Sequence, residues 1–516
     1  MSTRSGQPAA QVHPKALSAG NLVVGLLMAA LSGAICMQII GRIGVTPNTS
    51  IIGAIVAIVL SRAFAAWKPL DSQNLIQTYT SAGGFAAANA GLLTVAIVFL
   101  LGRQDLVLPM LVGAAIGVIL DIVFVKELYN TKVYPAEGAW PPGVATAEAL
   151  WAADEGGRRA RRLVEGIVAG IIGTHFKLPM AGIGIAFIAN IFAITSLGIG
   201  LLIRGYSVRL FGVNLAQTYI PHGMMIGAGL IQLVQAFLII ASKRNEAQVD
   251  KTEEDSGIPR KILIHFGLFV AGALVLALVG GVLTEMTASQ VVIFLLFAGF
   301  AAAASTIIVG LCAMHSGWFP AFAVTLIFLT VGMFLGIPAI PLALLTGYTA
   351  STGPLFADFG YDLKTGWLIR GRGANMEYEK EGRRQQFYAE VMGGLMGLAM
   401  VAIFANMHFQ LDLLPPVSRV FAATIKAGAR PEILRELLIW SVPGALIQLV
   451  GGPRRAMGVL FATGLLINNP NYGWGLVIAV IIRKIIGEEP MKVREAGLIA
   501  GDGLYGFVNS IMRTFF

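Results

Sequence analysis

The sequence predicts an all-α membrane protein that crosses the bilayer many times. Apolar residues make up 56% of the 516-residue chain and charged residues only 13%, which is about half the charged share of soluble domains. A single soluble core stops growing near about 250–300 residues, so it could not bury this much apolar sequence. The 62 glycines are also typical of transmembrane helices that pack closely.

Apolar runs of spanning length occur along the whole chain. A span needs roughly 20 apolar residues, and such runs predict about 14 to 16 membrane segments. Two runs, 134–151 and 338–356, are interrupted by Pro and Gly, which predicts broken or re-entrant helices. In order, we expect a cytoplasmic N-terminal tail (1–19), a first transmembrane repeat (20–241), a polar linker (242–261) and a second transmembrane repeat (262–516).

The basic residues gather beside the apolar runs, although the net charge of +9 alone would also suit a nucleic-acid partner. Lys and Arg concentrate in the cytoplasmic loops of membrane proteins, so the charge predicts topology rather than nucleic-acid binding. Two clusters should face the cytoplasm: Arg158, Arg159, Arg161 and Arg162, and then Lys364, Arg370, Arg372, Arg383 and Arg384.

The two halves of the chain resemble each other. Three short matches follow one another in the same order and at nearly the same offset along the chain, which predicts an internal duplication. They pair YTSAGGFAAANAG (79–91) with YTASTGPLFADFG (348–360), WPPGVATAEA (140–149) with LPPVSRVFAA (414–423), and GMMIGAGLIQLVQ (223–235) with GLIAGDGLYGFVN (497–509). Transporters commonly pair two repeats around a central site, where broken helices supply free backbone groups.

Ionisable residues inside apolar segments are the first candidates for contact with protons or substrate. Each costs about 2.5–3.5 kcal/mol on insertion scales, so such residues line pathways or pair with one another. We expect the stretch ADFGYDLKTG (357–366) to be a break in the helix, because Asp362 and Lys364 can face each other only if it is unwound. Alternatively, Lys364 extends outward from the membrane interface. The candidates are Glu148, Asp358, Asp362, Asp502 and His222.

Two roles are open for Glu148. It follows Pro141 and Pro142, which would begin a short apolar helix. In a cavity of low dielectric constant its carboxyl group could take up a proton and release it on the other side. Alternatively, it pairs with the Arg158–Arg162 cluster.

Uncharged polar residues supply the candidate substrate contacts. Amides and hydroxyls suit a peptide backbone or a hydroxylated chelate, although Ser and Thr also form ordinary hydrogen bonds between membrane helices. These candidates are Gln77, Tyr79, Thr80, Ser81, Tyr348 and Thr349, with Lys364 beside them. The six histidines lack metal-ligand spacing, so we expect no metal and no cofactor. The GDGLYG stretch around Asp502 has no strand before it, which excludes a dinucleotide site.

Six stretches of the sequence match a known family pattern: NLIQTYTSAGG (74–84), WPPGVATAEAL (140–150), PHGMMIGAGLI (221–231), DLKTGWLIRG (362–371), RRQQFYAEVMGG (383–394) and LPPVSRVFAA (414–423). At these stretches the sequence resembles the oligopeptide transporter superfamily, and the DLKTG and PPGVATAE motifs are the most specific. NPG and KIPPR motifs are absent from the sequence. It is more similar to the yellow-stripe-like and prokaryotic branch than to the peptide branch of fungi and plants.

This resemblance implies a secondary transporter with two related halves. Family members use a proton gradient to move small peptides, modified peptides or metal–chelator complexes. The implied partners are protons, a small-molecule or short-peptide substrate and the lipid bilayer, with a homo-oligomer possible. The implied location is the inner (cytoplasmic) membrane of a bacterium. His222 stands where the family pattern has Gly.

Two other classes of protein compete with this reading. A passive channel would use the repeats to frame an open pore. A membrane-embedded enzyme would need a nucleophile–base pair or a metal site, and the chain contains neither HExxH nor GxSxG. It also lacks the GxxxxGK[ST] loop of ATP-driven transporters. The sequence therefore favours a carrier over a channel, and a channel over an enzyme.

Overall fold

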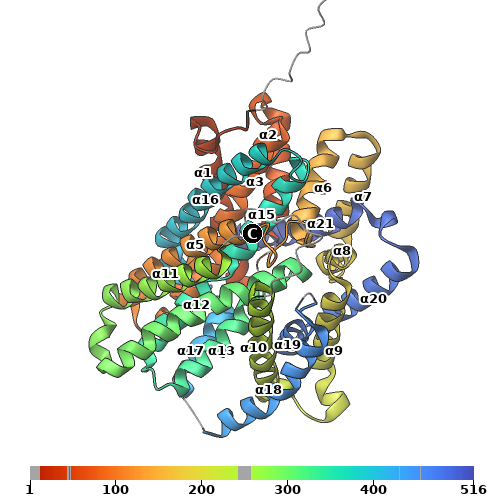
Figure 1. The fold of residues 1–516 in the computed structure, drawn as a ribbon. Helices are drawn as coiled ribbons and strands as arrows, with labels where there is room; N and C mark the ends of the chain where they lie inside the picture. Colours follow the sequence, from red (N-terminus) through yellow and green to blue (C-terminus); the bar gives the residue numbers. More distant parts are fainter. Residues whose placement is uncertain are drawn as a thin grey trace, which may run out of the picture.

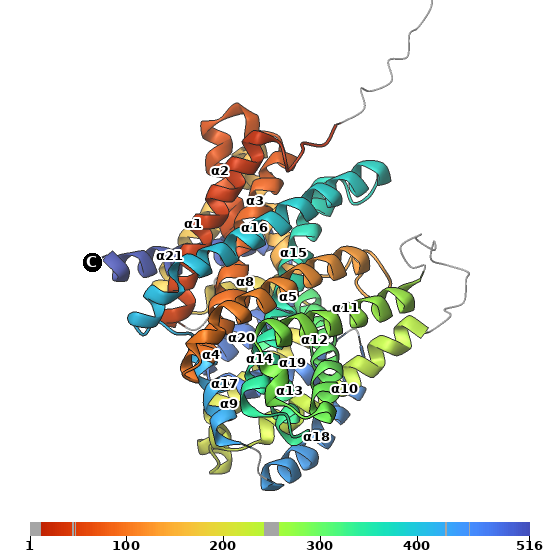
Figure 2. The same ribbon diagram turned by 90° about the vertical axis from the view of Figure 1, so that its left-hand side faces the viewer.

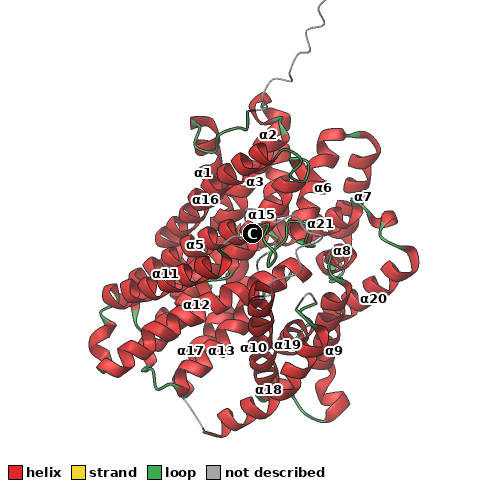
Figure 3. Ribbon diagram, viewed as in Figure 1, coloured by secondary structure: helices red, strands yellow, loops and turns green. Residues whose placement is uncertain are grey.

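The computed structural model describes residues 12–43, 46, 48–241, 257–428, 431–453 and 455–515. Much of the predicted tail (1–11) and of the predicted linker (242–256) lies outside them. The described residues form helices joined by short loops, without a strand among them (Figure 3). The prediction of an all-α protein is therefore confirmed.

Twenty-one α-helices follow one another in the described part of the chain. Proline at the first or second position begins α6, α11, α15, α17 and α20, where its missing N–H group costs no hydrogen bond. The helices are α1 (Ala19–Ile43), α2 (Thr49–Ala63), α3 (Leu70–Phe85), α4 (Leu93–Leu100), α5 (Val107–Leu128), α6 (Pro141–Glu155), α7 (Gly157–His175), α8 (Met180–Ile188), α9 (Ile191–Phe211), α10 (Ile220–Ala241), α11 (Ile258–Val279), α12 (Ala288–Ser316), α13 (Ala321–Phe334), α14 (Ala339–Ser351), α15 (Pro354–Ile369), α16 (Met376–Gln410), α17 (Pro416–Ala427), α18 (Pro431–Gly451), α19 (Met457–Leu466), α20 (Pro470–Ile486) and α21 (Arg494–Phe515).

Eight helices of the described residues are long and apolar enough to cross a membrane. Three shorter apolar helices, α2, α13 and α19, accompany them. The chain is therefore an integral membrane protein with several spans. The prediction of about 14 to 16 segments also counted runs that fold as short or interrupted helices, such as α8 and α14. The eight are Ala19–Gly41, Leu70–Leu100, Gln104–Leu128, Ile191–Phe211, Ile258–Val279, Ala288–Ser316, Met376–Gln410 and Glu432–Gly451.

The helices form two groups that are visible in Figure 1. In the first, α3 packs against α1, α2 and α16, and almost every residue of α3 is buried. In the second, α7 packs against α21, α10 against α18, and α9 against α19 and α20. Figure 1 shows α1, α3, α5 and α16 on the left and α7, α9 and α20 on the right, and in Figure 2 the left-hand side of Figure 1 faces the viewer.

Two buried segments depart from regular α-helix. Residues Ala86–Leu92 form a π-helical segment between α3 and α4, a rare geometry that is frequent at functional sites. The second departure lies between α14 and α15, where Gly353 has φ 102°. There Asp121 Oδ2 accepts from the Gly353 N–H at 2.5 Å and from the Phe356 N–H at 3.4 Å. The buried carboxylate of Asp121 thus accepts hydrogen bonds from backbone N–H groups at the start of α15.

This break corrects one prediction about position. The run 338–356 is interrupted as expected, but residues 357–366 are regular helix within α15. The expectation that ADFGYDLKTG is unwound is therefore wrong. Gly360 serves close packing instead, because a Cβ atom there would clash with the ring of Trp140.

The starts of several helices recur at the offsets of the sequence matches. The start of α12 follows that of α1 by a certain number of residues. The same separation in sequence relates the start of α14 to that of α3 and the start of α16 to that of α5. The slightly larger shift that carries the start of α7 onto that of α18 also carries α10 onto α21. The pairing of α7 with α21 and that of α18 with α10 are equivalent under this second shift. These positions support the internal duplication, which stays a prediction.

The crossing of α10 and α18 gives a test of the packing. A Cβ atom on Gly227 would clash with the Ser441 carbonyl oxygen, so any side chain there would force the helices apart. We expect Gly227→Leu to lower strongly the yield of monodisperse protein in size-exclusion chromatography. Gly267→Leu in α11 is the control, because a Cβ atom there meets nothing within 4 Å. Equal recovery of the two variants would contradict the close crossing.

Candidate functional site

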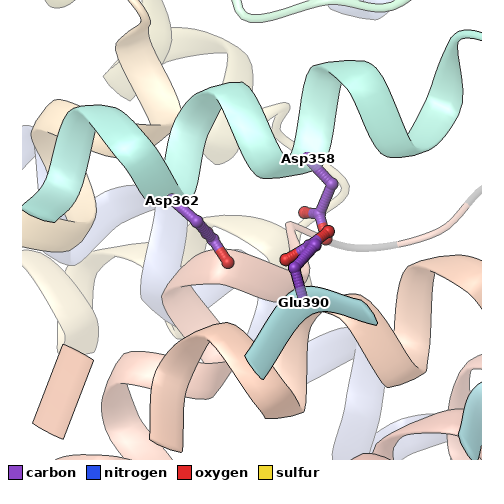
Figure 4. Close-up of side chains that lie close together, drawn as sticks. All are labelled: Asp358, Asp362 and Glu390. Carbon is purple, nitrogen blue, oxygen red and sulfur yellow. The ribbon is translucent and has the colours of Figure 1, made fainter. Parts of the chain in front are cut away.

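Three buried carboxyl groups meet between α15 and α16. Asp358 and Asp362 lie one helical turn apart on the same face of α15, and Glu390 approaches from α16. The exposed fraction is 1% for Asp358 and 0% for the other two. Carboxylate oxygens of the three lie within 4.8 Å of one another. Figure 4 shows the side chains of Asp358 and Glu390 pointing toward each other, with Asp362 farther along α15. We call these three residues the acidic cluster.

Neutral donors from α2 and α3 surround the acidic cluster. Ser81 Oγ donates to Asp358 Oδ1 at 2.8 Å. Ser50 Oγ and Gln77 Nε2 donate to Asp362 Oδ1 at 2.9 Å and 2.6 Å. Within the described ranges, no Lys or Arg forms an ion pair with the cluster. These hydroxyl and amide groups position the carboxyl groups without neutralising them.

Most carboxylate oxygens of the acidic cluster accept no hydrogen bond from the described residues. Oδ2 of Asp358, Oδ2 of Asp362 and both carboxylate oxygens of Glu390 are buried and have no hydrogen-bond partner. An unpaired buried charge is costly, and three negative charges so close together would also repel one another. The arrangement therefore favours the binding of protons or another hard cation, for which oxygen groups are suitable partners.

A cavity of about 890 Å³ adjoins the acidic cluster, and Asp358 is part of its wall. This volume lies within the roughly 300–1,000 Å³ that small-molecule sites occupy. Its wall combines residues of α2, the π-helical segment and α15 with residues of α8, α20 and α21. The wall is mostly apolar, and its aromatic rings and amides include Phe85, Trp318, Phe319, Phe322, Tyr361, Tyr472, Asn48, Asn89, Asn469 and Asn471.

The structure brings several predicted residues to this region. Gln77, Ser81, Asp358 and Asp362 meet at the acidic cluster. Asp502 lines the same cavity, but its carboxylate already accepts from the Ala181 N–H at 2.7 Å and from a neighbouring Thr hydroxyl. Asp502 thus caps the start of α8.

Other predicted contacts serve the packing of the helices. Tyr79 donates to the Ala16 carbonyl at 3.2 Å and Tyr348 to the Phe269 carbonyl at 3.1 Å. Thr80 donates to a carbonyl of its own helix. None of these side chains lines the cavity, so substrate contact for them stays an untested prediction that the geometry does not favour.

Three further predicted residues also lie away from the cavity wall. The ammonium of Lys364 donates to the Ala136 carbonyl at 2.6 Å and lies 4.5 Å from the ring centroid of Trp367. Thr349 is fully buried on α14. His222 lies on α10, where its ring packs 5.6 Å from that of Tyr219. Lys364 therefore faces away from its sequence neighbour Asp362.

Glu148 pairs with the Arg158–Arg162 cluster, which is the alternative role that the sequence left open for it. Its Oε2 lies 2.5 Å from Nη2 of Arg159, which joins α6 to the start of α7. Arg159 also pairs with Glu155. The geometry favours an ion pair within the basic cluster over a free proton-binding group.

Sequence reasoning missed Glu390 and Ser50. Glu390 lies inside the long helix α16, whose first turns carry many charged residues that suggest an exposed position. One signal in the sequence could have identified Glu390. The offset between the two repeats that pairs Asn89 with Asp358 also pairs the acidic residue Asp121 with Glu390. Asn89 lines the same cavity as Asp358. Ser50 carried no signal, because a Ser at the start of a helix is ordinary.

Comparison with known proteins agrees with the resemblance in the sequence. The family model described as OPT oligopeptide transporter protein matches residues 19–241 and 217–513. No curated protein and no solved structure matches the chain. Members of this family are transporters and not enzymes. Because the two matched ranges cover nearly the whole sequence, the chain belongs to the OPT oligopeptide transporter family.

Proposed function

We propose that the chain is a symporter that uses a proton gradient to move small oligopeptides, or related peptide-like or metal-chelate compounds, across the cytoplasmic membrane. The family supports oligopeptide transport. The proton coupling rests on one observation: an acidic cluster with unpartnered carboxylate oxygens adjoins a cavity of substrate size.

Asp358 links the two parts of this mechanism. It belongs to the acidic cluster and also forms part of the cavity wall. A proton on the cluster removes negative charge from the wall, and its release restores that charge. A substrate in the cavity therefore interacts differently with the two protonation states, which is the condition for coupling two binding events.

The proposed movement uses the two repeats, 20–241 and 262–516. Transporters with repeats alternate access by moving one element against another around a fixed site. The recurring helix starts support this division, and the cavity receives wall residues from both repeats. We place the N-terminal tail and the Arg158–Arg162 cluster on the cytoplasmic side of a bacterial inner membrane. We also assign the chain to the yellow-stripe-like and prokaryotic branch of the family.

Charge movement in proteoliposomes tests the proposal. Under an inward proton gradient, trialanine and a ferric chelate are added separately, and we expect current and uptake with one class of compound. Collapse of the gradient by a protonophore should remove the accumulation. A leak of solute that ignores the gradient would contradict symport and would indicate a channel.

A further inference from the structure

The residues that precede α1 pack against α3 and α16. Ala16 is fully buried, in one apolar cluster with Tyr79 of α3 and Ala389 of α16. Side chains of the same two helices hold both backbone groups of Ala16. Its N–H donates to Gln385 Oε1 at 2.8 Å, and its carbonyl accepts from the Tyr79 hydroxyl at 3.2 Å. We call residues 12–18 the latch, because they connect α3 to α16.

His13 is the titratable residue at the centre of this contact, and only 4% of it is exposed. Its Nδ1 lies 2.8 Å from the Pro14 carbonyl, and because a carbonyl only accepts, this nitrogen carries the proton of the neutral ring. Nε2 faces Oδ1 of Asp71 on α3 at 3.6 Å, and neither atom has a hydrogen-bond partner among the described residues. The other oxygen of Asp71 accepts from the Tyr378 hydroxyl of α16 at 2.6 Å.

The buried position of His13 opposes its charged form. Burial lowers the pKa of His13 below its usual value, and the positive charge of Arg370 acts in the same direction. Asp71 and Glu381 oppose this effect, but the 3.6 Å separation from Asp71 is too long for a good hydrogen bond to the charged ring. The ring of Tyr378 lies 5.4 Å from that of His13. The groups that face His13 are thus Asp71 from α3, Tyr378 and Glu381 from α16, and Arg370 after α15.

The direction of this effect sets how the latch responds to pH. A histidine whose pKa is lower in the docked segment takes up a proton more readily when the segment is released. Docking is therefore at full strength above the unperturbed histidine pKa of about 6.5 and weakens as the pH falls below it.

We propose that the latch is a pH-sensitive switch, docked while His13 is neutral and released when His13 takes up a proton. Release removes the contacts that connect α3 to α16 through the latch. Gln77 and Ser81 of α3 donate to the acidic cluster, and α16 carries Glu390, so release loosens the support of that cluster. The inference rests on the proposed function for the cytoplasmic position of the tail. Proton symport acidifies that side, so release limits further proton entry.

Hydrogen–deuterium exchange of the purified full-length protein tests the release directly. The readout is the protection of residues 12–18, corrected for the intrinsic pH dependence of amide exchange. We expect the protection to fall at least about fivefold from about pH 7.5 to about pH 5.5, the range in which a free histidine gains its proton. Protection that stays constant in the native protein, or that rises at acid pH, would overturn the inference.

Three variants assign the effect to His13. His13→Gln cannot gain a proton in this range, so its protection should not change between the two pH values. Asp71→Asn removes a charge that favours the protonated ring, so its release should shift to lower pH. His175→Gln is the control, because it removes an exposed histidine elsewhere and should behave as the native protein does.

The pair of His13 and Asp71 variants keeps the test decisive. A native pH dependence in His13→Gln would place the sensor in another residue. If His13→Gln left the latch unprotected at both pH values, the Asp71→Asn midpoint would decide, and an unchanged midpoint would overturn the inference.

Uptake assays separate this inference from the proposed function. At a fixed proton gradient, lowering the pH on both sides of the proteoliposome membrane should slow uptake more in the native protein than in His13→Gln. Release of the latch without this difference would overturn its role in transport. A native protein without gradient-driven uptake at any pH would contradict the proposed function. Gradient-driven uptake by a protein whose latch exchanges independently of pH would contradict the latch alone.

Discussion

Replacing Glu390 with Gln is expected to abolish proton-driven accumulation of substrate while leaving the protein folded. Both carboxylate oxygens of Glu390 lack a partner, so the substitution breaks no hydrogen bond within the described structure. Gln has nearly the same shape but cannot exchange a proton. Gradient-driven uptake should fall at least about tenfold, a change in free energy of about 1.4 kcal/mol or more.

Two measurements separate lost coupling from lost structure. The thermal unfolding midpoint of the Glu390→Gln protein should stay at or above that of the native protein, because a buried ionisable group has been replaced with a neutral one. Exchange of substrate without a proton gradient should persist. Loss of exchange together with a lower midpoint would mean that Glu390 supports the fold.

Glu148→Gln is the matched control. It changes a second carboxyl group in the same way, but Glu148 is paired with Arg159 and does not line the cavity. We expect its gradient-driven uptake to stay within about twofold of native, since Glu148 belongs neither to the acidic cluster nor to the cavity wall. If Glu148→Gln removed coupling and Glu390→Gln did not, the acidic cluster would not be the proton site.

The class of fold followed directly from composition, because only a bilayer gives this much apolar sequence a place to be buried. The breaks were harder to position. Proline and glycine around 338–356 indicated an interruption, and one exists at Gly353. Gly360 suggested another, yet it lies in a regular helix and makes room for Trp140. A sequence shows that glycine is present but does not show whether a turn or a neighbour requires it.

Parts of the acidic cluster could be predicted because charge inside an apolar segment is costly wherever it occurs. Asp358 and Asp362 stand out for that reason. Glu390 does not, because its helix starts with a charged stretch and only the three-dimensional fold shows that the later turns are buried. The choice between two roles for Glu148 needed the position of Arg159, which no spacing along the chain reveals.

A buried ion pair joins the end of α15 to the first turns of α16. We call this connection the joint between the two helices. Arg370 Nε lies 2.8 Å from Glu379 Oε2, and the side chains of both residues are fully buried. Arg383 Nε lies 3.1 Å from Oε1 of the same Glu379. The sequence predicted that Arg370 and Arg383 face the cytoplasm in a basic cluster, whereas the structure buries both. One carboxylate therefore contacts two guanidinium groups.

Glu379→Gln is expected to destabilise the protein by about 3–5 kcal/mol, because removal of one member of a buried pair leaves uncompensated charge. The thermal unfolding midpoint in detergent should fall by several degrees. Glu165→Gln is the control, since it removes an exposed pairing with Arg494 and should leave the midpoint nearly unchanged. Because α15 and α16 carry the acidic cluster, a looser joint should also weaken coupling. Equal midpoints for the two variants would show that the joint does not depend on this charge balance.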